Sequence, residues 1–418
     1  MKANWPTVPL TQAVMFRGGG TPPKKNPKYW GGPIPWVSPK DMKSAFVDSS
    51  QDTITRDALA GSAVKVIPEG ATLIVVRSGI LARTVPVAVA ARELTVNQDL
   101  KALVPGEQVD PRFLHYFMQS AEPYLLSRVT RGATVHKLDS EVLESLQVPL
   151  PSRGEQQCIV AILDEAFAGI ATAVANTEKN LANARRLFES YLNAVFSQRG
   201  EGWTESPLET LVTDSCTLSY GIVQPGSDVR GGIPVVRPTD LRQKLIRRDT
   251  LKTIDPSLAK AYSRTTLHGG DLLLCVRGTT GDLSVAATEL EGANVTRGIV
   301  PIRFNPSLLN QELGYHLLRS PFVQDQIAEK TYGAALMQIN IKDVRKLLVL
   351  VPPHETHEEL CSCLNDFSAE TDQLQSIYGQ KHNALSELKK SLLQKAFSGE
   401  LTAGKAAADA MRQVEEIA

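Results

Sequence analysis

The sequence has 418 residues, and its 45 basic and 45 acidic side chains leave no formal net charge. This length predicts about two or three domains, and the charge balance excludes a protein that binds nucleic acid through bulk positive charge alone. No uninterrupted apolar run reaches the roughly 18 residues of a membrane span, no signal-peptide core follows Met1, and five cysteines are too few for a disulfide scaffold. We therefore expect a soluble cytoplasmic protein.

The first predicted domain, residues 1–150, mixes short strands with turns and helices. Residues 18–23 and 29–33 are predicted turns because they are rich in glycine and proline. Residues 71–76 and 84–90 are predicted buried strands, and residues 110–120 a helix. The pattern is typical of a mixed α/β domain.

A long spacer helix is predicted for residues 151–200, directly after Pro149 and Pro151. Apolar positions recur there at alternating spacings of four and three, which is typical of a coiled-coil seam. The seam residues expected to pair with another helix are Leu163, Phe167, Ile170, Val174, Leu181, Phe188, Tyr191 and Val195.

The chain then repeats itself as a second domain (201–351), a second spacer helix (352–401) and an Ala-rich tail (402–418). Matching motifs such as Trp5 and Trp203, or Gly132 and Gly333, are 198 to 201 residues apart and keep the same order along the chain. This period is too long for a solenoid repeat. The sequence therefore predicts an α+β protein with two homologous domains.

The second spacer helix carries its own seam, which we expect to pair antiparallel with the first as a coiled coil. Its predicted pairing residues are Leu360, Leu364, Phe367, Leu374, Tyr378, Leu385, Leu388 and Leu392, and Thr177 and Lys381 are polar positions on the two seams. About 40 helical residues measure roughly 60 Å. Two similar domains on such a rod would suit a bipartite linear target, with a span of roughly fifteen to twenty base pairs on B-DNA.

Several motifs around the spacer helices identify a family. An Ile-Pro-x-Val-x-Pro-x-Asp motif occurs at residues 34–41 and again at 233–240, Val-Pro-Leu-Pro at 148–151 precedes Glu155 and Gln156, and Leu-Leu-Gln-Lys-Ala-Phe-Ser-Gly-Glu-Leu closes the second helix at 392–401. With the Gly-Gly-Gly-Thr-Pro-Pro loop at 18–23, the chain resembles the DNA-specificity subunit of type I restriction-modification systems, a defence against foreign DNA. The second copy departs from the pattern, because Thr356 and His357 replace the Glu-Gln pair.

The resemblance implies a function without catalysis. Two target-recognition domains would each read one half of an asymmetric bipartite site on double-stranded DNA, and the two spacer helices would dock two methyltransferase subunits. Two restriction subunits would join through the methyltransferase subunits. The chain would bind no cofactor or metal of its own, since S-adenosylmethionine and ATP would be bound by partner subunits.

Two other functional classes stay open from the residues alone. One is a coiled-coil scaffold with two protein-binding domains, and the other is a self-contained DNA methyltransferase. Phe16-Arg17-Gly18-Gly19-Gly20 has the form of an S-adenosylmethionine loop, but the prolines that follow exclude the required helix. His354, His357, Cys361 and Cys363 lie close in sequence, and we expect solvent-side histidines and seam-side cysteines rather than a zinc site.

DNA contacts are expected from Arg, Lys, Asn, Gln, Thr and Tyr side chains in loops, because these reach base edges and phosphates. The first domain offers Arg17, Thr21, Lys24, Lys25, Lys40, Arg77, Ser78, Arg131, Thr134, His136 and Lys137. The second offers Tyr220, Gln224, Arg237, Thr239, Arg242, Arg277, Thr279, Thr280, Tyr332, Gln338, Asn340 and Lys342. For any one of these residues the alternative is a solvated side chain, and for Arg77 and Arg277 it is a structural ion pair at a strand end.

Overall fold

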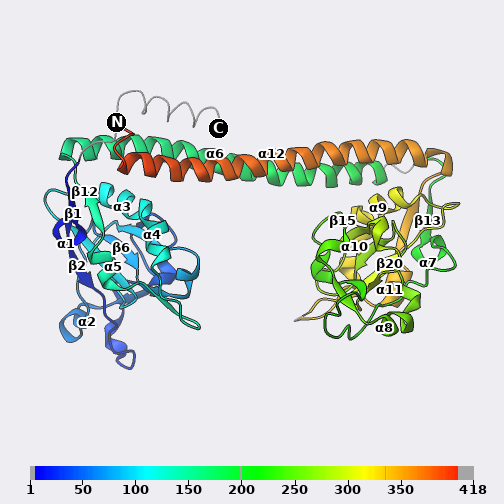
Figure 1. The fold of residues 1–418 in the computed structure, drawn as a ribbon, viewed down its shortest axis with the longest axis horizontal. Helices are drawn as coiled ribbons and strands as arrows, with labels where there is room; N and C mark the ends of the chain where they lie inside the picture. Colours follow the sequence, from blue (N-terminus) through cyan, green and yellow to red (C-terminus); the bar gives the residue numbers. More distant parts are fainter. Residues whose placement is uncertain (1–4, 198–199, 335, 403–418) are drawn as a thin grey trace. The chain divides into compact units, whose positions relative to one another are not determined.

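The computed structural model describes residues 5–197, 200–334 and 336–402, so most of the predicted Ala-rich tail lies outside the described residues. The chain divides into two units (Figure 1). Unit 1 combines Met1–Glu178 with Gly379–Ala418, and unit 2 is the continuous segment Lys179–Tyr378. Each unit contains one α/β domain and half of each long helix. The predicted α+β class, with two domains joined by long helices, is confirmed.

Short strands and helices build the α/β domain of unit 1. In chain order they are β1 (Thr7–Pro9), α1 (Leu10–Ala13), β2 (Val14–Gly18), η1 (Pro27–Tyr29), β3 (Trp30–Val37), η2 (Pro39–Asp41), β4 (Phe46–Val47), β5 (Asp52–Ile54), α2 (Arg56–Gly61), β6 (Thr72–Val75), β7 (Arg77–Ser78), η3 (Gly79–Ala82), β8 (Val87–Ala90), β9 (Thr95–Val96), β10 (Leu100–Pro105), α3 (Pro111–Ser120), α4 (Glu122–Ser127), β11 (His136–Lys137), α5 (Ser140–Glu144) and β12 (Gln147–Pro149).

The strands of unit 1 form a five-stranded sheet of order β2-β10-β6-β8-β4 and a three-stranded sheet of order β5-β3-β9. In the larger sheet only β4 runs parallel to its neighbour, with Phe46 opposite Val89. Residues 29–33 were predicted as a turn, but residues 30–33 form the first half of β3, which pairs with β5 through a register shift between Trp30 and Ile34. Gly31 makes this irregularity possible, because its φ of +78° is accessible to glycine at little cost.

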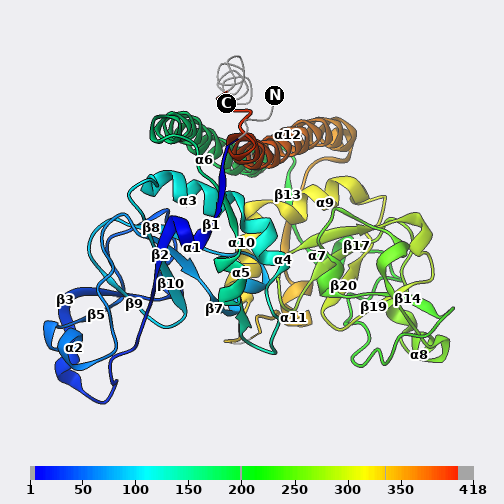
Figure 2. The same cartoon turned by 60° about the vertical axis from the view of Figure 1, so that its left-hand side comes forward.

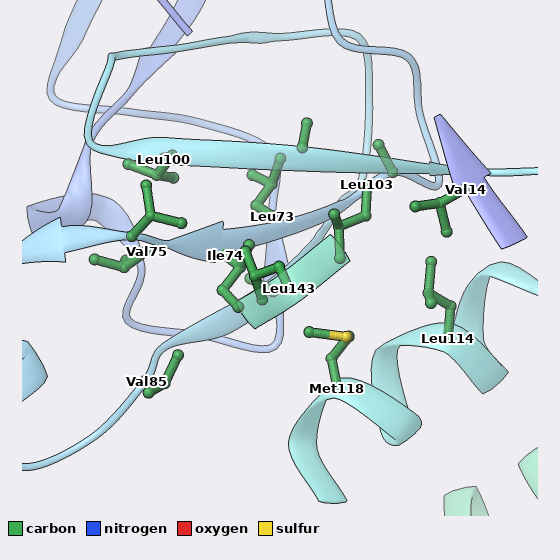
Figure 3. Packing of buried hydrophobic residues seen from close by; sticks show 14 of the residues in the cluster. Val14, Leu73, Ile74, Val75, Val85, Leu100, Leu103, Leu114, Met118 and Leu143 are labelled. Atoms are coloured by element: carbon green, nitrogen blue, oxygen red, sulfur yellow. The ribbon is translucent and has the colours of Figure 1, made fainter. Parts of the chain in front are cut away.

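The core of unit 1 lies between the larger sheet and helix α3. Figure 3 shows Leu114 and Met118 of α3 pointing towards Leu73, Ile74 and Leu103 on β6 and β10. Asp110 caps the helix by accepting hydrogen bonds from the backbone N–H groups of the first turn. Burial of these apolar side chains fixes the sheet whose strand β6 leads directly into β7.

The same kinds of element recur in unit 2. They are β13 (Thr204–Pro207), α7 (Leu208–Leu211), β14 (Ile233–Val236), η4 (Pro238–Asp240), β15 (Leu245–Ile246), η5 (Arg248–Thr250), β16 (Lys252–Ile254), α8 (Pro256–Ala261), η6 (Ser263–Thr265), β17 (Leu272–Cys275), β18 (Leu283–Ala286), η7 (Thr288–Leu290), β19 (Asn294–Val295), β20 (Ile299–Ile302), α9 (Gln311–Arg319), α10 (Pro321–Lys330), α11 (Ile341–Arg345), β21 (Leu348–Val351) and η8 (His354–Thr356).

The sheets of unit 2 repeat the order found in unit 1. The order β20-β17-β18-β15 corresponds to β10-β6-β8-β4, and β16-β14-β19 corresponds to β5-β3-β9. The parallel and antiparallel pairings also correspond, since β15 runs parallel to β18 and β14 parallel to β19. Strand β2 has only a remnant in unit 2, the isolated bridge between Val212 and Phe304. The duplication seen in the sequence is therefore a duplication of topology.

The two long helices are α6 (Arg153–Ser197) and α12 (His357–Phe397). In unit 1 the first half of α6 packs on the last half of α12, with Leu163 and Ile170 buried in one cluster with Leu388 and Leu392. In unit 2 the last half of α6 shares a cluster with the first half of α12, through residues such as Phe188 and Leu364. The helices therefore run antiparallel in both units. Figure 2 shows α3 next to α6 and α9 next to α12.

The buried row of each helix differs in part from the predicted seam. Ala166, Ala173, Leu192 and Phe196 of α6 are buried although the prediction left them out. At the two alanines the small side chain allows a close approach of the packed elements. Of the predicted residues, Phe167, Val174, Leu181, Tyr191, Val195, Leu360, Phe367 and Tyr378 are half-buried, and Leu385 is buried. Leu374 is 37% exposed and lies outside the buried row, where Ser368 and Thr371 are buried instead.

The starts of the two helices keep one contact despite their different sequences. Gln156 is buried, and its Nε2 donates to the Pro151 carbonyl oxygen at 2.9 Å. His357 occupies the corresponding place, with Nε2 3.0 Å from the Pro352 oxygen. The expectation that His357 faces solvent is therefore wrong, because its ring replaces the amide that fills this position in unit 1.

Within the described residues, one helix, spanning Arg153–Phe196, is long and apolar enough to cross a membrane by length and composition. Asp164 and Glu165 interrupt the apolar run of this helix, so the sequence contains no uninterrupted apolar segment of that length. A single helix of this kind is weak evidence, since the core helix of a soluble protein meets the same criterion. Ile159, Leu163 and Ile170 of this helix are buried against protein side chains.

Candidate nucleic-acid interface

A polar hairpin stands beside the end of β6 in unit 1. The backbone N–H of Thr130 donates to the Lys137 oxygen at 2.8 Å, and that of Lys137 donates back at 3.0 Å. Strand β11 then pairs with β7, placing Lys137 opposite Arg77 and His136 opposite Ser78. The fold thus brings together six of the predicted residues: Arg77, Ser78, Arg131, Thr134, His136 and Lys137.

The hairpin of unit 1 presents positive charge. Arg77, Arg131, Thr134 and Lys137 are exposed. Lys137 lies 2.6 Å from Asp139, and this hydrogen bond lowers the pKa of the carboxyl group. Arg77 and Arg131 form no ion pair within the part of the chain that the structure describes, so the structural ion pair considered for Arg77 is not seen there.

The remaining predicted residues of unit 1 lie on the loops around β2, β3 and β9. Arg17 is half-buried and donates to the Val66 oxygen at 2.8 Å, and Lys40 forms an exposed ion pair with Asp52 at 2.8 Å. The hydrogen bond between Lys40 and Asp52 raises the pKa of Lys40. Lys24 and Lys25 are exposed. Arg17 therefore has an internal role that lowers its availability to a ligand.

The loop between β9 and β10 connects these groups. Thr21 donates a hydrogen bond to Gln98, and the backbone N–H groups of Val76 and Arg77 both donate to the Asp99 oxygen, at 2.8 and 3.2 Å. Gln98 is exposed and was missed by the sequence analysis. Its signal was available, because it follows a buried strand that has a counterpart in the second copy.

Unit 2 has a corresponding hairpin beside the end of β17. Tyr332 and Gln338 exchange backbone hydrogen bonds of 2.9 and 2.8 Å, and Gln338 also bridges to Arg277. The Tyr332 hydroxyl donates to Asn340 at 2.8 Å, and Thr331 lies 3.3 Å from Thr280. The predicted residues gathered here are Arg277, Thr279, Thr280, Tyr332, Gln338 and Asn340. Arg277, for which an ion pair was considered, forms none with any described residue.

Arg297 of unit 2 corresponds to Gln98 and was also missed. It is exposed, and its guanidinium carbon lies 5.9 Å from the centre of the Tyr220 ring. Tyr220 itself is half-buried, and its hydroxyl donates to the Ile339 oxygen at 3.1 Å. Tyr220 therefore binds the backbone of the hairpin, and Arg297 is the exposed cation next to the Tyr220 ring.

The other predicted residues of unit 2 differ in how free they are. Arg237 holds Asp240 through two guanidinium nitrogens, at 3.1 and 2.8 Å, and this hydrogen bonding raises the pKa of Arg237. Thr239, Gln224 and Lys342 are exposed. Arg242 is exposed and lines a cavity with Glu189 and Asp372 of the long helices. Arg237 thus stabilises a turn within its own domain.

The cysteine and histidine cluster at the start of α12 has structural contacts. Cys361 is buried and donates to Glu312 at 3.3 Å, whereas Cys363 is exposed and lies 2.8 Å from the Tyr191 hydroxyl. Burial, with the neighbouring carboxylate, raises the pKa of Cys361 to about 12, so its thiol stays protonated and is a poor metal ligand. Among the described residues, no group of three or more His, Cys, Asp or Glu could hold a metal ion.

The glycine-rich segment after β2 lacks the context of a cofactor loop. The next helical element along the chain is η1, a single turn at Pro27–Tyr29. A loop that binds S-adenosylmethionine would lead directly into a helix N-terminus. The two hairpins, by contrast, present donors and cations on a fixed backbone. The protein therefore belongs to a class defined by a duplicated α/β domain, a polar hairpin in each copy and a pair of antiparallel helices.

Comparisons of the sequence with known proteins find similar proteins of one kind. Residues 2–181 match the type I restriction modification DNA specificity domain. The chain is 35% identical over 198 residues to the EcoR124I/EcoR124II specificity subunit of Escherichia coli, covering 47% of this chain and 48% of that relative. It is 25% identical over 431 residues to the MjaIX specificity subunit of Methanocaldococcus jannaschii, covering 95% and 94%. The chain is therefore similar, along most of its length, to specificity subunits of type I restriction-modification systems.

Solved structures show the same fold. A chain from a study of complex assembly and conformational transition of the type I R-M system has a TM-score of 0.74 at 17% identity, covering 96% of this chain and all of that one. The HsdS subunit from Thermoanaerobacter tengcongensis has a TM-score of 0.53 at 18% identity, covering 95% and 97%. The alignment with the E. coli EcoR124I/EcoR124II relative spans about half of the length of that protein.

Proposed function

We propose that this chain reads an asymmetric bipartite site on double-stranded DNA, one half-site for each unit. The observation that supports this is the pair of corresponding hairpins, held on equivalent strand ends but carrying different side chains. Lys137 occupies the place of Gln338, and Gln98 that of Arg297. Lysine and arginine favour guanine edges, whereas glutamine favours adenine. The two half-sites are therefore different sequences.

The long helices are proposed to set the gap between the half-sites. Each unit includes half of α6 and half of α12, so both helices take part in both units. Four extra residues lengthen a helix by about 6 Å, which corresponds to roughly two base pairs of B-DNA. Insertion of four residues in both helices is expected to lengthen the unread gap, and an unchanged gap would contradict the proposal.

The helices are also proposed to dock two methyltransferase subunits, and through them two restriction subunits. Leu187, Leu374 and Ile377 are large apolar side chains left exposed on the helices of unit 2. Exposed apolar side chains on otherwise paired helices are typical of a partner surface. In this proposal the chain is a soluble cytoplasmic subunit without catalysis, and partner chains bind S-adenosylmethionine and ATP.

Sequence selection from a random duplex library, with the chain co-purified with its host partners, tests the proposal. Two short and different half-sites with a fixed unread gap are the expected result. No enrichment, with no methyltransferase in the co-purified material, would favour the scaffold with two protein-binding domains. Transfer of a labelled methyl group from S-adenosylmethionine to DNA by the purified chain alone would instead show a self-contained methyltransferase.

A further inference from the structure

The hairpin of unit 2 carries an apolar tip. Leu336 is 46% exposed, Met337 43% and Tyr332 45%. The corresponding hairpin of unit 1 has Arg131 and Thr134 near its tip, with Val135 as its exposed apolar residue. Exposed apolar side chains are common singly, but two adjacent ones on a polar loop mark a contact surface.

The backbone holds this tip in place. Besides the exchange between Tyr332 and Gln338, the Gly278 N–H donates to the Met337 oxygen at 2.8 Å and the Ile339 N–H donates to the Val276 oxygen at 3.1 Å. Gly333 has a φ of +119°, and a Cβ atom there would lie 2.3 Å from the Leu336 oxygen. The apolar side chains are therefore held outward by the fold.

The surroundings of the tip favour a nucleic acid over a protein partner. Gln338 and Asn340 lie on the same hairpin, and Arg277 is paired with it without a counter-ion among the described residues. Lys342 is exposed at the start of α11. An apolar tip with cationic and amide side chains behind it complements a polyanion that has apolar groups in its groove.

The paired backbone segments of the hairpin, bridged between Tyr332 and Gln338, favour one groove of B-DNA. The major groove of B-DNA admits a two-stranded ribbon, whereas the minor groove is about half as wide. Among base edges in the major groove, the apolar group is the C5-methyl of thymine. We propose that Leu336 and Met337 contact thymine C5-methyl groups in the major groove of the half-site read by unit 2. This inference rests on the proposed function and specifies the chemistry of one half-site.

Replacing thymine by deoxyuridine removes the methyl group without changing base pairing, and this gives the test. With the chain in complex with its partners, we expect each substituted contact in one half-site to weaken binding about fourfold, since one buried methyl group is lost. Leu336→Ala with Met337→Ala should bind the thymine and uracil duplexes equally. Both side chains are exposed, and unchanged thermal unfolding of the variant checks that it folds.

Matched controls separate the possible outcomes. Val135→Ala in unit 1 should leave the thymine preference of the half-site read by unit 2 unchanged. Equal binding of thymine and uracil duplexes by the unsubstituted chain, or a preference that persists in the double variant, would overturn the inference while leaving the two-part site intact. A loss of affinity in the double variant with no uracil effect, accompanied by a change in 2-aminopurine fluorescence, would replace it with insertion between bases. Absence of any sequence-specific binding would instead be the failure of the proposed function.

Discussion

The two units join their α/β domain to a long helix at the same three positions, but with different chemistry. In unit 1, Arg112 lies 2.5 Å from Asp164 of α6, and the Tyr116 hydroxyl donates to the same carboxylate. In unit 2 the corresponding residues are Glu312, His316 and Asn365, and the His316 Nε2 lies 2.9 Å from the Asn365 oxygen. The ion pair of one copy is thus replaced in the other by hydrogen bonds among a histidine, an amide and the Glu312 carboxylate.

The difference shows what duplication preserves at this joint. Burial and the bond to Asp164 raise the pKa of Tyr116, whereas burial lowers the pKa of His316 to about 4. Each joint keeps its own hydrogen bonds to the long helix, so the contact with the helix is kept although the charges are not. The joint can therefore change independently in each unit, as long as its members change together.

The largest effects are expected from the buried leucines next to this joint. Leu163 and Leu364 are fully buried at corresponding positions of α6 and α12. Leu163→Ala and Leu364→Ala should each lower the free energy of unfolding by about 2–5 kcal/mol, because each leaves a cavity. Hydrogen exchange should show the loss in unit 1 for the first and in unit 2 for the second. Equal loss in both units for either variant would show that the units do not unfold separately.

Acid should destabilise both units through their buried histidines. Burial lowers the pKa of His115 and of His316 to about 4, from an ordinary value of 6.5. Because the unfolded chain binds the proton first, stability is full above about pH 6.5 and falls as pH drops towards 4, by up to about 3 kcal/mol for each histidine. Urea titrations across this range measure the slope. His316→Gln should remove the pH dependence of the unfolding free energy of unit 2. An unchanged slope for unit 2 in this variant would show that His316 does not cause that dependence.

Exchanging the chemistry of the two joints sharpens the comparison. Asp164→Asn should cost unit 1 about 1–2 kcal/mol, because Arg112 and Tyr116 lose a charged acceptor. Asn365→Asp places a carboxylate beside Glu312 and should raise the pKa of His316, which NMR titration would detect. If Asp164→Asn leaves the unfolding of unit 1 unchanged, the ion pair does not stabilise that joint.

The smallest effect is expected at corresponding turn positions of the two domains. Lys40 is exposed and paired with Asp52, and Thr239 stands in its place in unit 2. Lys40→Ala should leave the melting temperature unchanged but reduce the salt dependence of DNA binding by about one released counterion. Thr239→Ala is the matched control and should not change the salt dependence. A salt slope that stays the same for Lys40→Ala would remove this lysine from the interface.

Sequence patterns located the periodic and capped elements well. The helix at residues 110–120 and the strands near 71–76 and 84–90 were predicted because apolar spacing reports burial directly. The assignment of Trp30 to a strand could not be predicted, because the bulge after it depends on pairing with the partner strand β5. The long helices were predicted, but Ala166 and Ala173 of the buried row were not, because side-chain size does not reveal how closely two helices approach.

The predicted contact residues remain a prediction, and their positions in the fold could not be predicted from the sequence. Arg77 and Lys137 are 60 positions apart, and their pairing depends on a two-residue strand. Tyr220 and Arg237 were predicted as contacts on residue type alone, and their polar groups instead bind their own domain. Gln98 and Arg297 were missed although each lies just after a short buried strand, β9 or β19, that recurs in the two copies.

Unit 2 is one continuous stretch of chain, whereas unit 1 is divided between the two ends of the sequence. During synthesis, residues 179–378 leave the ribosome before the part of α12 that buries Ile159, Leu163 and Ile170. At a synthesis rate of about 5–20 residues per second, this apolar face stays exposed for roughly 10–40 s before the last part of α12 can pack on it. The order of synthesis therefore allows unit 2 to complete its fold first. Unit 1 is the part whose apolar surface stays exposed to chaperones until the end of the chain is made.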